Sequence, residues 1–351
     1  MSDVPRRPLQ VAVQTGLDPK SWQTAVDYVR EADRLGVHSA WVAEAWGADA
    51  VSPLGYLAAV TERIRLGSGI LQISSRTPAM TGRTALTLSA LTGGRFILGL
   101  GASGPQVVEG LDGQPFAHPL GRMRETIDIV RLVASGEKVA YEGRHFRLPR
   151  PGGEGKALRV TVPPDPSLPV YLATLSPRML ELTGEVADGW LGTSFTPSGA
   201  AYYTDHIDRG AARAGRTLAD ITLSAGGDVA FSDDVDALVA ARKPGLAFSL
   251  GGMGSPTTNF YNDAYRAQGW AEVAEKVQRL WVEGRRDDAA RAVPDEMVLE
   301  TTMIGTEDMV RQRMRAWRDA GIDLLRVYPA GRSLDERVAT LARTMELVAE
   351  L

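Results

Sequence analysis

Short apolar segments alternate with longer amphipathic segments along nearly the whole chain. Uninterrupted apolar runs of this length are typical of strands that are buried on both faces, and amphipathic segments between them are typical of crossover helices. The alternation therefore predicts an α/β protein with parallel strands. The eight strands expected are Leu9 to Thr15, Ser39 to Ala45, Arg65 to Leu71, Arg95 to Ala102, Pro169 to Thr174, Gly189 to Ser194, Ile221 to Phe231 and Asp323 to Tyr328.

The segments between these strands carry helix start and stop signals. Ser21 and Ser333 are candidate N-caps, and Ser176–Pro177 supplies a cap followed by a first helical residue. Gly36 and Gly321 stand where helices should end, each directly before a strand. Eight strand and helix units with such turns favour a closed (β/α)8 TIM barrel, formed as a single domain over residues 1–351.

Two segments are longer than a plain barrel requires, namely residues 137–168 and 243–302. The first contains VAYEGRHFRL, which predicts a small hairpin, and the second contains the helical pattern AEVAEKVQRLWVEG. We expect both insertions on the C-terminal face of the barrel, where long segments commonly serve as lids or substrate walls.

The composition argues against several classes of partner and chemistry. A formal charge of -4 without a basic run argues against nucleic-acid partners. No apolar run approaches the roughly 18 residues that a membrane span needs, so a cytoplasmic protein without membrane contact is expected. With no cysteine and four histidines that lack metal-ligand spacing, thiolate chemistry is excluded and no metal site is expected.

The stretch from Ile64 to Gln106 is rich in glycine at its strand ends, which suits a backbone lying against a flat ligand such as a planar redox cofactor. Gly99, Gly101 and Gly104 spell GxGxxG after a strand. The following PQVVEGLDGQPF cannot open a long helix, so the spacing does not indicate a Rossmann fold.

Other candidate residues follow predicted strands. Glu44 and Trp46 should lie at the mouth of the second strand, where the carboxyl group could contact a cofactor or donate a proton, or could cap the next loop. Arg76 could pair with an anionic ligand or brace a loop. Asn259 and Tyr261 could wall a substrate site or pack the second insertion onto the barrel.

A further candidate is the strand-to-helix junction LATLSPRML, from Leu172 to Leu180. The unpaired N–H groups of a helix N-terminus at the end of a barrel strand suit a phosphate. Simple capping is the alternative interpretation.

Five motifs resemble the bacterial luciferase-like superfamily, specifically its coenzyme F420-dependent oxidoreductase branch. They are AEAWGADAVSPL (43–54), ERIRLGSGILQISSRTPAM (62–80), LTGGRFILGLGASGPQVVEG (91–110), EVADGWL (185–191) and GGMGSPTTNFYND (251–263). The resemblance covers nearly the entire chain. It implies a TIM barrel with the deazaflavin at the carboxyl ends of the strands, and it leaves FMN as the alternative cofactor.

The resemblance also implies roles for particular residues. Gly69 and Ile70 match the non-prolyl cis peptide that lies behind the ring in relatives. Further matches, to positions that contact the cofactor or its phosphate, are Gly101, Ala102, Ser103, Thr174, Leu175, Ser176, Pro177 and Arg178, with Glu44 as an additional candidate.

Two departures concern the sugar-phosphate dehydrogenases of the superfamily. Those enzymes have an acid and a histidine after the second strand and a glutamate after the fourth. At the corresponding positions, this chain has Glu44 followed by Ala45 after the second strand and Gly104 after the fourth. We therefore expect hydride transfer between the deazaflavin C5 and a small organic substrate, reducing an activated C=C, C=N or C=O bond, with Glu44 or water as proton donor.

The alternatives are an FMN-dependent monooxygenase and a cofactor-binding protein without catalysis. Dimers are common among the proteins that this chain resembles, so the resemblance makes a homodimer one possible assembly.

Overall fold

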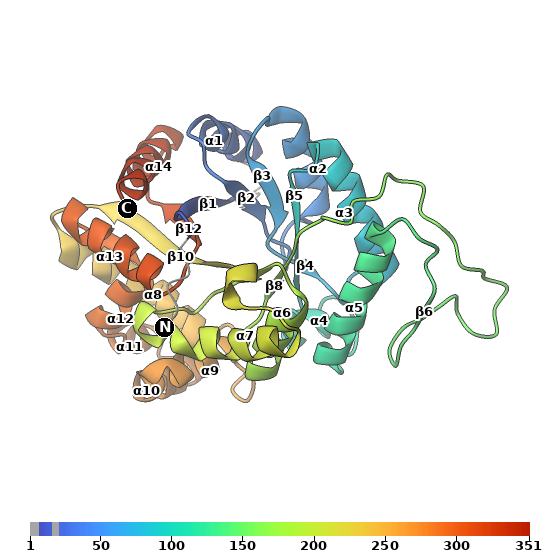
Figure 1. The fold of residues 1–351 in the computed structure, drawn as a ribbon. Helices are drawn as coiled ribbons and strands as arrows, with labels where there is room; N and C mark the ends of the chain where they lie inside the picture. The colour runs from blue at the N-terminus through green and yellow to red at the C-terminus, as the bar shows by residue number, and fades with distance from the viewer. Residues whose placement is uncertain (1–6, 16–20) are drawn as a thin grey trace. The chain divides into compact units, whose positions relative to one another are not determined.

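The computed structural model describes residues 7–15 and 21–351. Its strands form one sheet in the order β11-β10-β12-β1-β2-β3-β5-β8-β9, and a further pairing of β9 with β10 closes the ring of a (β/α)8 barrel (Figure 1). The registers between neighbouring barrel strands are parallel. The strands are β1 (Gln10–Thr15), β2 (Ser39–Val42), β3 (Arg65–Ser68), β4 (Leu71–Gln72), β5 (Phe96–Gly101), β8 (Val170–Ala173), β9 (Gly189–Leu191), β10 (Thr222–Phe231), β11 (Met303–Gly305) and β12 (Leu324–Pro329).

All eight expected barrel strands are present, so the prediction of fold class is confirmed. The strand expected from Arg65 to Leu71 is interrupted after Ser68 and resumes as β4. Strand β11 was not predicted from the sequence. It pairs with the end of β10 and has only three residues, too few to show a pattern.

The helices are α1 (Trp22–Arg34), α2 (Val51–Val60), α3 (Pro78–Thr92), α4 (Pro105–Val108), α5 (Pro119–Ala134), α6 (Pro177–Val186), α7 (Ala201–Arg213), α8 (Val235–Gly251), α9 (Phe260–Tyr265), α10 (Ala271–Val282), α11 (Arg286–Arg291), α12 (Asp295–Thr301), α13 (Glu307–Asp319) and α14 (Leu334–Ala349). Ser333 caps α14 by accepting the Glu336 N–H, as expected, whereas the side chain of Ser21 accepts no cap hydrogen bond. Gly36 and Gly321 have the positive φ angles, 78° and 97°, that end a helix.

The chain forms two compact units. Of the described residues, the first unit comprises 14–15, 21–173 and 185–190, and the second comprises 7–13, 174–184 and 191–351. In the first unit, the ring centroids of Trp41 and Tyr171 lie 5.7 Å apart. Glycines make room for both rings, because a Cβ on Gly67 would lie 2.4 Å from Trp41 Cε3 and one on Gly189 would lie 2.6 Å from the Tyr171 ring.

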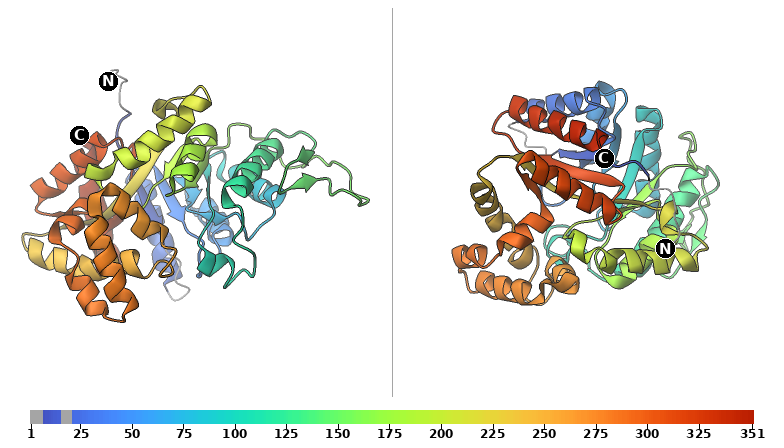
Figure 2. Two further views of the ribbon diagram at one scale, coloured as in Figure 1. Left: turned by 90° about the horizontal axis from the view of Figure 1, so that it is seen from below. Right: turned by 60° about the vertical axis from the view of Figure 1, so that its left-hand side comes forward.

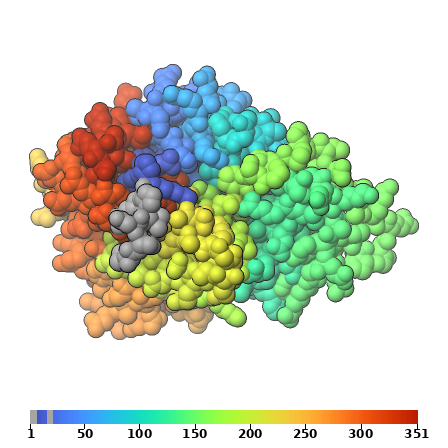
Figure 3. Space-filling model, viewed as in Figure 1, coloured from blue at the N-terminus to red at the C-terminus, as the bar shows by residue number. Residues whose placement is uncertain are grey.

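The insertion at residues 137–168 does contain the expected hairpin, formed by β6 (Tyr141–Glu142) and β7 (Arg147–Leu148). Its expected location on the C-terminal face is wrong. The segment leads from the end of α5 to the start of β8, the return path from a helix to the next strand, and it extends beyond α5 (Figures 2 and 3). Glu125 of α5 accepts N–H groups from residues 144–146, which fastens the hairpin along this helix.

The second insertion does follow a strand, β10, but it begins with α8 at Val235 rather than at residue 243. Helices α8 to α12 pack around their own apolar cluster, which includes Leu250, Val277, Met297 and Val298. Gln268 anchors this helical segment: its amide accepts from the Thr196 N–H and donates to the carbonyl of Ser194.

Candidate functional site

A cis peptide joins Gly69 to Ile70 between β3 and β4, as the family resemblance predicted. The peptide is held to the end of β2 from both sides. The Gly69 N–H donates to the Val42 carbonyl at 2.7 Å, and the Glu44 N–H donates to the Ile70 carbonyl at 3.2 Å. Gly69 and Ile70 are partly exposed at this point, so the backbone is accessible where a planar ligand was expected.

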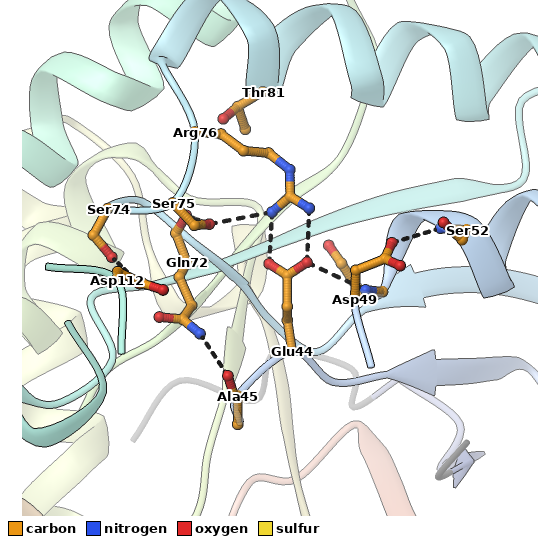
Figure 4. A network of polar contacts seen from close by, with 12 residues as sticks. Glu44, Ala45, Asp49, Ser52, Gln72, Ser74, Ser75, Arg76, Thr81 and Asp112 are labelled. Atoms are coloured by element: carbon orange, nitrogen blue, oxygen red, sulfur yellow. Dashed lines mark hydrogen bonds and ion pairs between the residues drawn. The ribbon is translucent and has the colours of Figure 1, made fainter. Parts of the chain in front are cut away.

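Glu44 and Arg76 form a two-pronged ion pair (Figure 4). Arg76 Nη1 lies 2.6 Å from Glu44 Oε2, and Nη2 lies 2.7 Å from Oε1. The Ala50 N–H also donates to Oε1, at 3.2 Å. Hydrogen bonding to Glu44 raises the pKa of Arg76 above its ordinary value, so the guanidinium is permanently charged.

The hydrogen bond between Glu44 and the Ala50 N–H closes a short loop. Residues 43–49 are exposed apart from Glu44, and Trp46 has 66% of its surface accessible. Glu44 stands at the start of this loop and accepts the N–H of Ala50 at its end, while Arg76 binds the same carboxyl group from outside the loop. The side chains of Glu44 and Arg76 are thus engaged with each other and with the loop backbone.

Gln72 lies beside this pair and contributes a second brace (Figure 4). Its Nε2 donates to the Ala45 carbonyl at 3.3 Å. Its side chain is buried, and its Oε1 has no hydrogen-bond partner among residues 7–15 and 21–351. Burying an acceptor without a hydrogen bond costs free energy. A hydrogen-bond donor that reached this oxygen would therefore be stabilised.

The strand end at Gly101 needs glycine because of a protein side chain. A Cβ on Gly101 would lie 2.8 Å from Cδ1 of Ile70. Beyond it, Ala102 and Ser103 are partly exposed, and Ser103 has a φ of 60°. The following helix, α4, has four residues, which confirms that the GxGxxG spacing does not open a long helix.

In the second unit, Thr174 to Arg178 lead into α6. The hydroxyls of Thr174 and Thr183 lie 2.8 Å apart, and the Tyr202 hydroxyl donates to the Leu175 carbonyl at 2.9 Å. Ser176 is half-buried, Pro177 begins the helix as expected, and Arg178 is exposed. The junction thus combines a helix N-terminus with a cationic side chain, which suits an anionic group.

Asn259 and Tyr261 take different positions. Asn259 is buried; its Oδ1 accepts the N–H groups of Tyr261 and Asn262, and its amide donates to the Leu250 carbonyl. It therefore caps α9, which is the packing interpretation rather than the substrate one. Tyr261 is partly exposed, and burial raises the pKa of its hydroxyl above the ordinary value.

One acidic residue of the barrel strands was not among the residues singled out by the sequence pattern. Asp228 is the only charged residue of β10, TLSAGGDVAF, and lies in register with Tyr328 of β12. Arg242 of α8 approaches it, with Nε 3.4 Å from Oδ2. The sequence did contain a signal for this residue, because Asp228 is a single charged residue within a strand of small and apolar residues.

Residues 7–15 and 21–351 contain no group of three or more His, Cys, Asp or Glu side chains arranged to hold a metal ion. Within the same ranges, no helix combines the length and apolar character that crossing a bilayer would demand.

Comparison with known proteins identifies the family. The model of the luciferase-like monooxygenase family matches residues 8–324. A Mycobacterium tuberculosis protein, provisionally named a coenzyme F420-dependent oxidoreductase, is 41% identical over 95% of this chain and 99% of its own length. The 5,10-methylenetetrahydromethanopterin reductase of Archaeoglobus fulgidus is 28% identical over 84% of this chain and 86% of its own.

A solved structure is similar along the whole fold. The coenzyme F420-dependent tetrahydromethanopterin reductase of Methanopyrus kandleri matches with a TM-score of 0.78 at 22% identity, covering 98% of this chain and 99% of that one. At this identity the likeness shows the barrel fold. Together with the family model and the 41% identical relative, it establishes that the chain belongs to the luciferase-like monooxygenase family, within the branch of F420-dependent oxidoreductases.

Proposed function

We propose that this protein is an F420-dependent oxidoreductase that transfers a hydride between the deazaflavin C5 and a small organic substrate. The proposed direction is reduction of an activated C=C, C=N or C=O bond by reduced F420. The observation that carries the proposal is the 41% identity, over nearly both full lengths, to a relative named for F420 dependence.

The residues present suit this cofactor. In the first unit, the accessible backbone at Gly69 and Ile70 and the small residues Gly101, Ala102 and Ser103 would contact the flat ring. In the second unit, the exposed N-terminus of α6 and the guanidinium of Arg178 would hold the phosphate; this set comprises Thr174, Leu175, Ser176, Pro177 and Arg178. The cofactor supplies two-electron hydride chemistry when bound, and the protein's task is orientation.

The geometry changes the role proposed for Glu44. Both oxygens of the Glu44 carboxyl group already accept hydrogen bonds, two from the Arg76 guanidinium and one from the Ala50 N–H. We propose that Glu44 is a positioning residue for the loop carrying Trp46. Trp46 and Tyr261 are the proposed substrate contacts, and Asn259 is not, because its side chain is committed to α9.

A cofactor titration tests the proposal. Purified protein is titrated in parallel with F420, FMN and NADPH, and binding is followed by ultrafiltration and fluorescence. We expect saturable binding of F420 and none of NADPH. Tight binding of FMN without F420, together with oxygen consumption during turnover, would establish the monooxygenase alternative instead.

Activity is measured separately. Protein loaded with reduced F420 is mixed with a set of enones, imines and activated ketones, and oxidation of the cofactor is followed by absorbance. Turnover with at least one class supports the reductase. Tight binding without oxidation by any of them would favour a cofactor-binding protein without catalysis.

An arginine variant tests the phosphate contact. Arg178→Ala is expected to weaken F420 binding by about tenfold, the effect of losing one charge-assisted hydrogen bond. Arg315 of α13 is also exposed, so Arg315→Ala is the matched control and should bind F420 as the unmodified protein does.

A further inference from the structure

Arg326 of β12 is a buried cation whose charge no described acid balances. The residue is 8% exposed. Its Nη2 donates to the Gly192 carbonyl, whereas its Nε is buried and has no hydrogen-bond partner among the described residues. Within residues 7–15 and 21–351, no carboxylate forms an ion pair with it. Burying a guanidinium without a counter-charge costs free energy, so this position would be stabilised by an anion from outside the chain.

The strands on either side of Arg326 leave room beside its side chain. Arg326 is in register with Ala12 of β1 and with Gly226 of β10. Gly226 cannot carry a side chain, because a Cβ there would lie 1.6 Å from the Arg326 carbonyl oxygen. Leu325 and Val327, which precede and follow Arg326, point to the opposite face of the strand. The guanidinium therefore lies on the face where the neighbouring strands have small residues.

The guanidinium reaches the carboxyl end of another strand. Because β10 lies between β12 and β9, the Arg326 side chain crosses β10 to contact Gly192, which directly follows β9. The Gly192 N–H donates to the Ser224 carbonyl of β10 at 2.6 Å. The Ser224 hydroxyl is also buried and has no hydrogen-bond partner in the part of the chain that the structure describes. Active sites of (β/α)8 barrels are built at the carboxyl ends of the strands.

Solvent reaches the residues next to Arg326. Gly226 is partly exposed, and Tyr328, two residues after Arg326 on the same strand, is 37% exposed. Asp228 is in register with Tyr328, but its carboxylate contacts another cation, Arg242 of α8. An anionic ligand would therefore meet Arg326 without displacing a carboxylate of the protein.

The unpaired groups select the chemistry of the ligand. A guanidinium can only donate hydrogen bonds, and a serine hydroxyl can donate one. A carboxylate only accepts, and its planar pair of oxygens matches the guanidinium. One guanidinium balances one negative charge, whereas a phosphate dianion would leave a second charge unbalanced at a buried position. A carboxylate is therefore the anion that suits Arg326.

We propose that Arg326 binds a carboxylate group of the substrate, so that this protein reduces small unsaturated or oxo acids. The inference rests on the proposed function for the reaction. The residues of the site, Arg326, Gly192, Ser224 and Gly226, all belong to the second compact unit. The hydrogen bond to Gly192 holds the guanidinium in place before the ligand arrives, which lowers the entropy cost of binding.

NMR of protein labelled with ¹⁵N-arginine tests the binding step without turnover. The Nε–H resonance of Arg326 is identified by its absence from Arg326→Lys. Crotonate, cinnamate and pyruvate are added in turn at constant ionic strength, each in parallel with its neutral amide. We expect at least one acid to shift this resonance saturably, and the amides to leave it unchanged. Inorganic phosphate should shift it less than that acid does.

An exposed arginine supplies the matched control. Arg315 of α13 is exposed, and its resonance is identified in the same way from Arg315→Lys. It should show no saturable shift with any of the acids or with phosphate.

Turnover with reduced F420 is the second measurement. Arg326→Gln should raise KM for the acid about tenfold or more, the effect of losing a charge-assisted hydrogen bond, and should leave the affinity for F420 unchanged. Arg326→Lys retains the charge but not the planar fork, so it should raise KM by less and guards against misfolding of the first variant. Arg315→Gln should change neither KM nor F420 binding.

Two outcomes would overturn the assignment: no saturable shift of the Arg326 resonance with any of the acids, or equal shifts with an acid and its amide. Weaker F420 binding by Arg326→Gln with an unchanged KM for the acid would also overturn it, because the guanidinium would then bind the cofactor. Failure of the proposed function is distinguishable, since the unmodified protein would then not bind F420 while the acids still shifted the Arg326 resonance.

Discussion

The indole ring of Trp41 lies directly against Gly67, on the neighbouring strand β3 and in register with it. Trp41 is fully buried, and its Nε1 donates to the hydroxyl of Ser39 at 3.0 Å. The large ring of one strand is therefore accommodated by the missing side chain of the next, which determines the packing inside this part of the barrel.

Gly67→Ala should destabilise the protein. The added methyl would lie 2.4 Å from Trp41 Cε3, and neither strand can move away without losing its hydrogen bonds. We expect the free energy of unfolding, measured by urea denaturation, to fall by about 1 to 3 kcal/mol. Gly55→Ala in α2 is the control: nothing lies within 4 Å of its Cβ, and helix propensity should raise stability by up to about 1 kcal/mol.

The Glu44 and Arg76 pair should be strongly coupled. Arg76→Gln leaves a largely buried carboxylate without its partner, and a loss of about 3 kcal/mol in stability is expected. Glu44→Gln combined with Arg76→Gln should recover part of this loss, and the double-mutant cycle gives the coupling energy. Additive effects of the two single changes would contradict the two-pronged contact.

The same variants separate bracing from proton donation. If Glu44 positions the Trp46 loop, Glu44→Gln raises KM and leaves the pH dependence of kcat unchanged. Loss of a titrating limb from the pH profile of Glu44→Gln would restore the proton-donor role considered from sequence.

Gln268 should be required for the stability of the second unit. Its side chain accepts from the Thr196 N–H and hydroxyl and donates to Ser194, Tyr203 and Ala264. Gln268→Ala leaves several buried groups unpaired, and we expect a loss of about 3 kcal/mol with faster proteolysis within residues 243–302. Gln312→Ala, at an exposed site on α13, should change stability by less than about 0.5 kcal/mol.

His38 should make stability depend on pH. Burial, followed by the charge of Arg65, lowers the pKa of His38 from 6.5 to about 4 in the folded protein. The unfolded chain therefore binds a proton below pH 6.5 that the folded protein does not bind until about pH 4. The resulting stability is present above pH 6.5 and is lost as the pH falls toward 4.

His38→Gln tests this dependence by thermal unfolding at a series of pH values. The variant should lose less stability than the unmodified protein between pH 6.5 and 4, since its side chain does not titrate. Parallel curves for the two proteins over this interval would show that His38 titrates normally in the folded state.

The sequence by itself determined the order and number of the barrel strands, because an apolar run bounded by amphipathic segments reports burial directly. It also indicated Pro177 as a helix start, Gly36 and Gly321 as helix ends, and, through the family resemblance, the cis bond between Gly69 and Ile70. Each of these features depends on residues close together in the chain.

Only the tertiary structure decided which side chains meet. The glycines near the strand ends were predicted to lie against a flat ligand, whereas Gly67 accommodates Trp41 and Gly101 accommodates Ile70. Arg76 was a candidate for an anionic ligand, but it binds Glu44, 32 residues away. Local patterns encode which positions are buried, but strand register brings distant residues together, and that register exists only once the strands have paired.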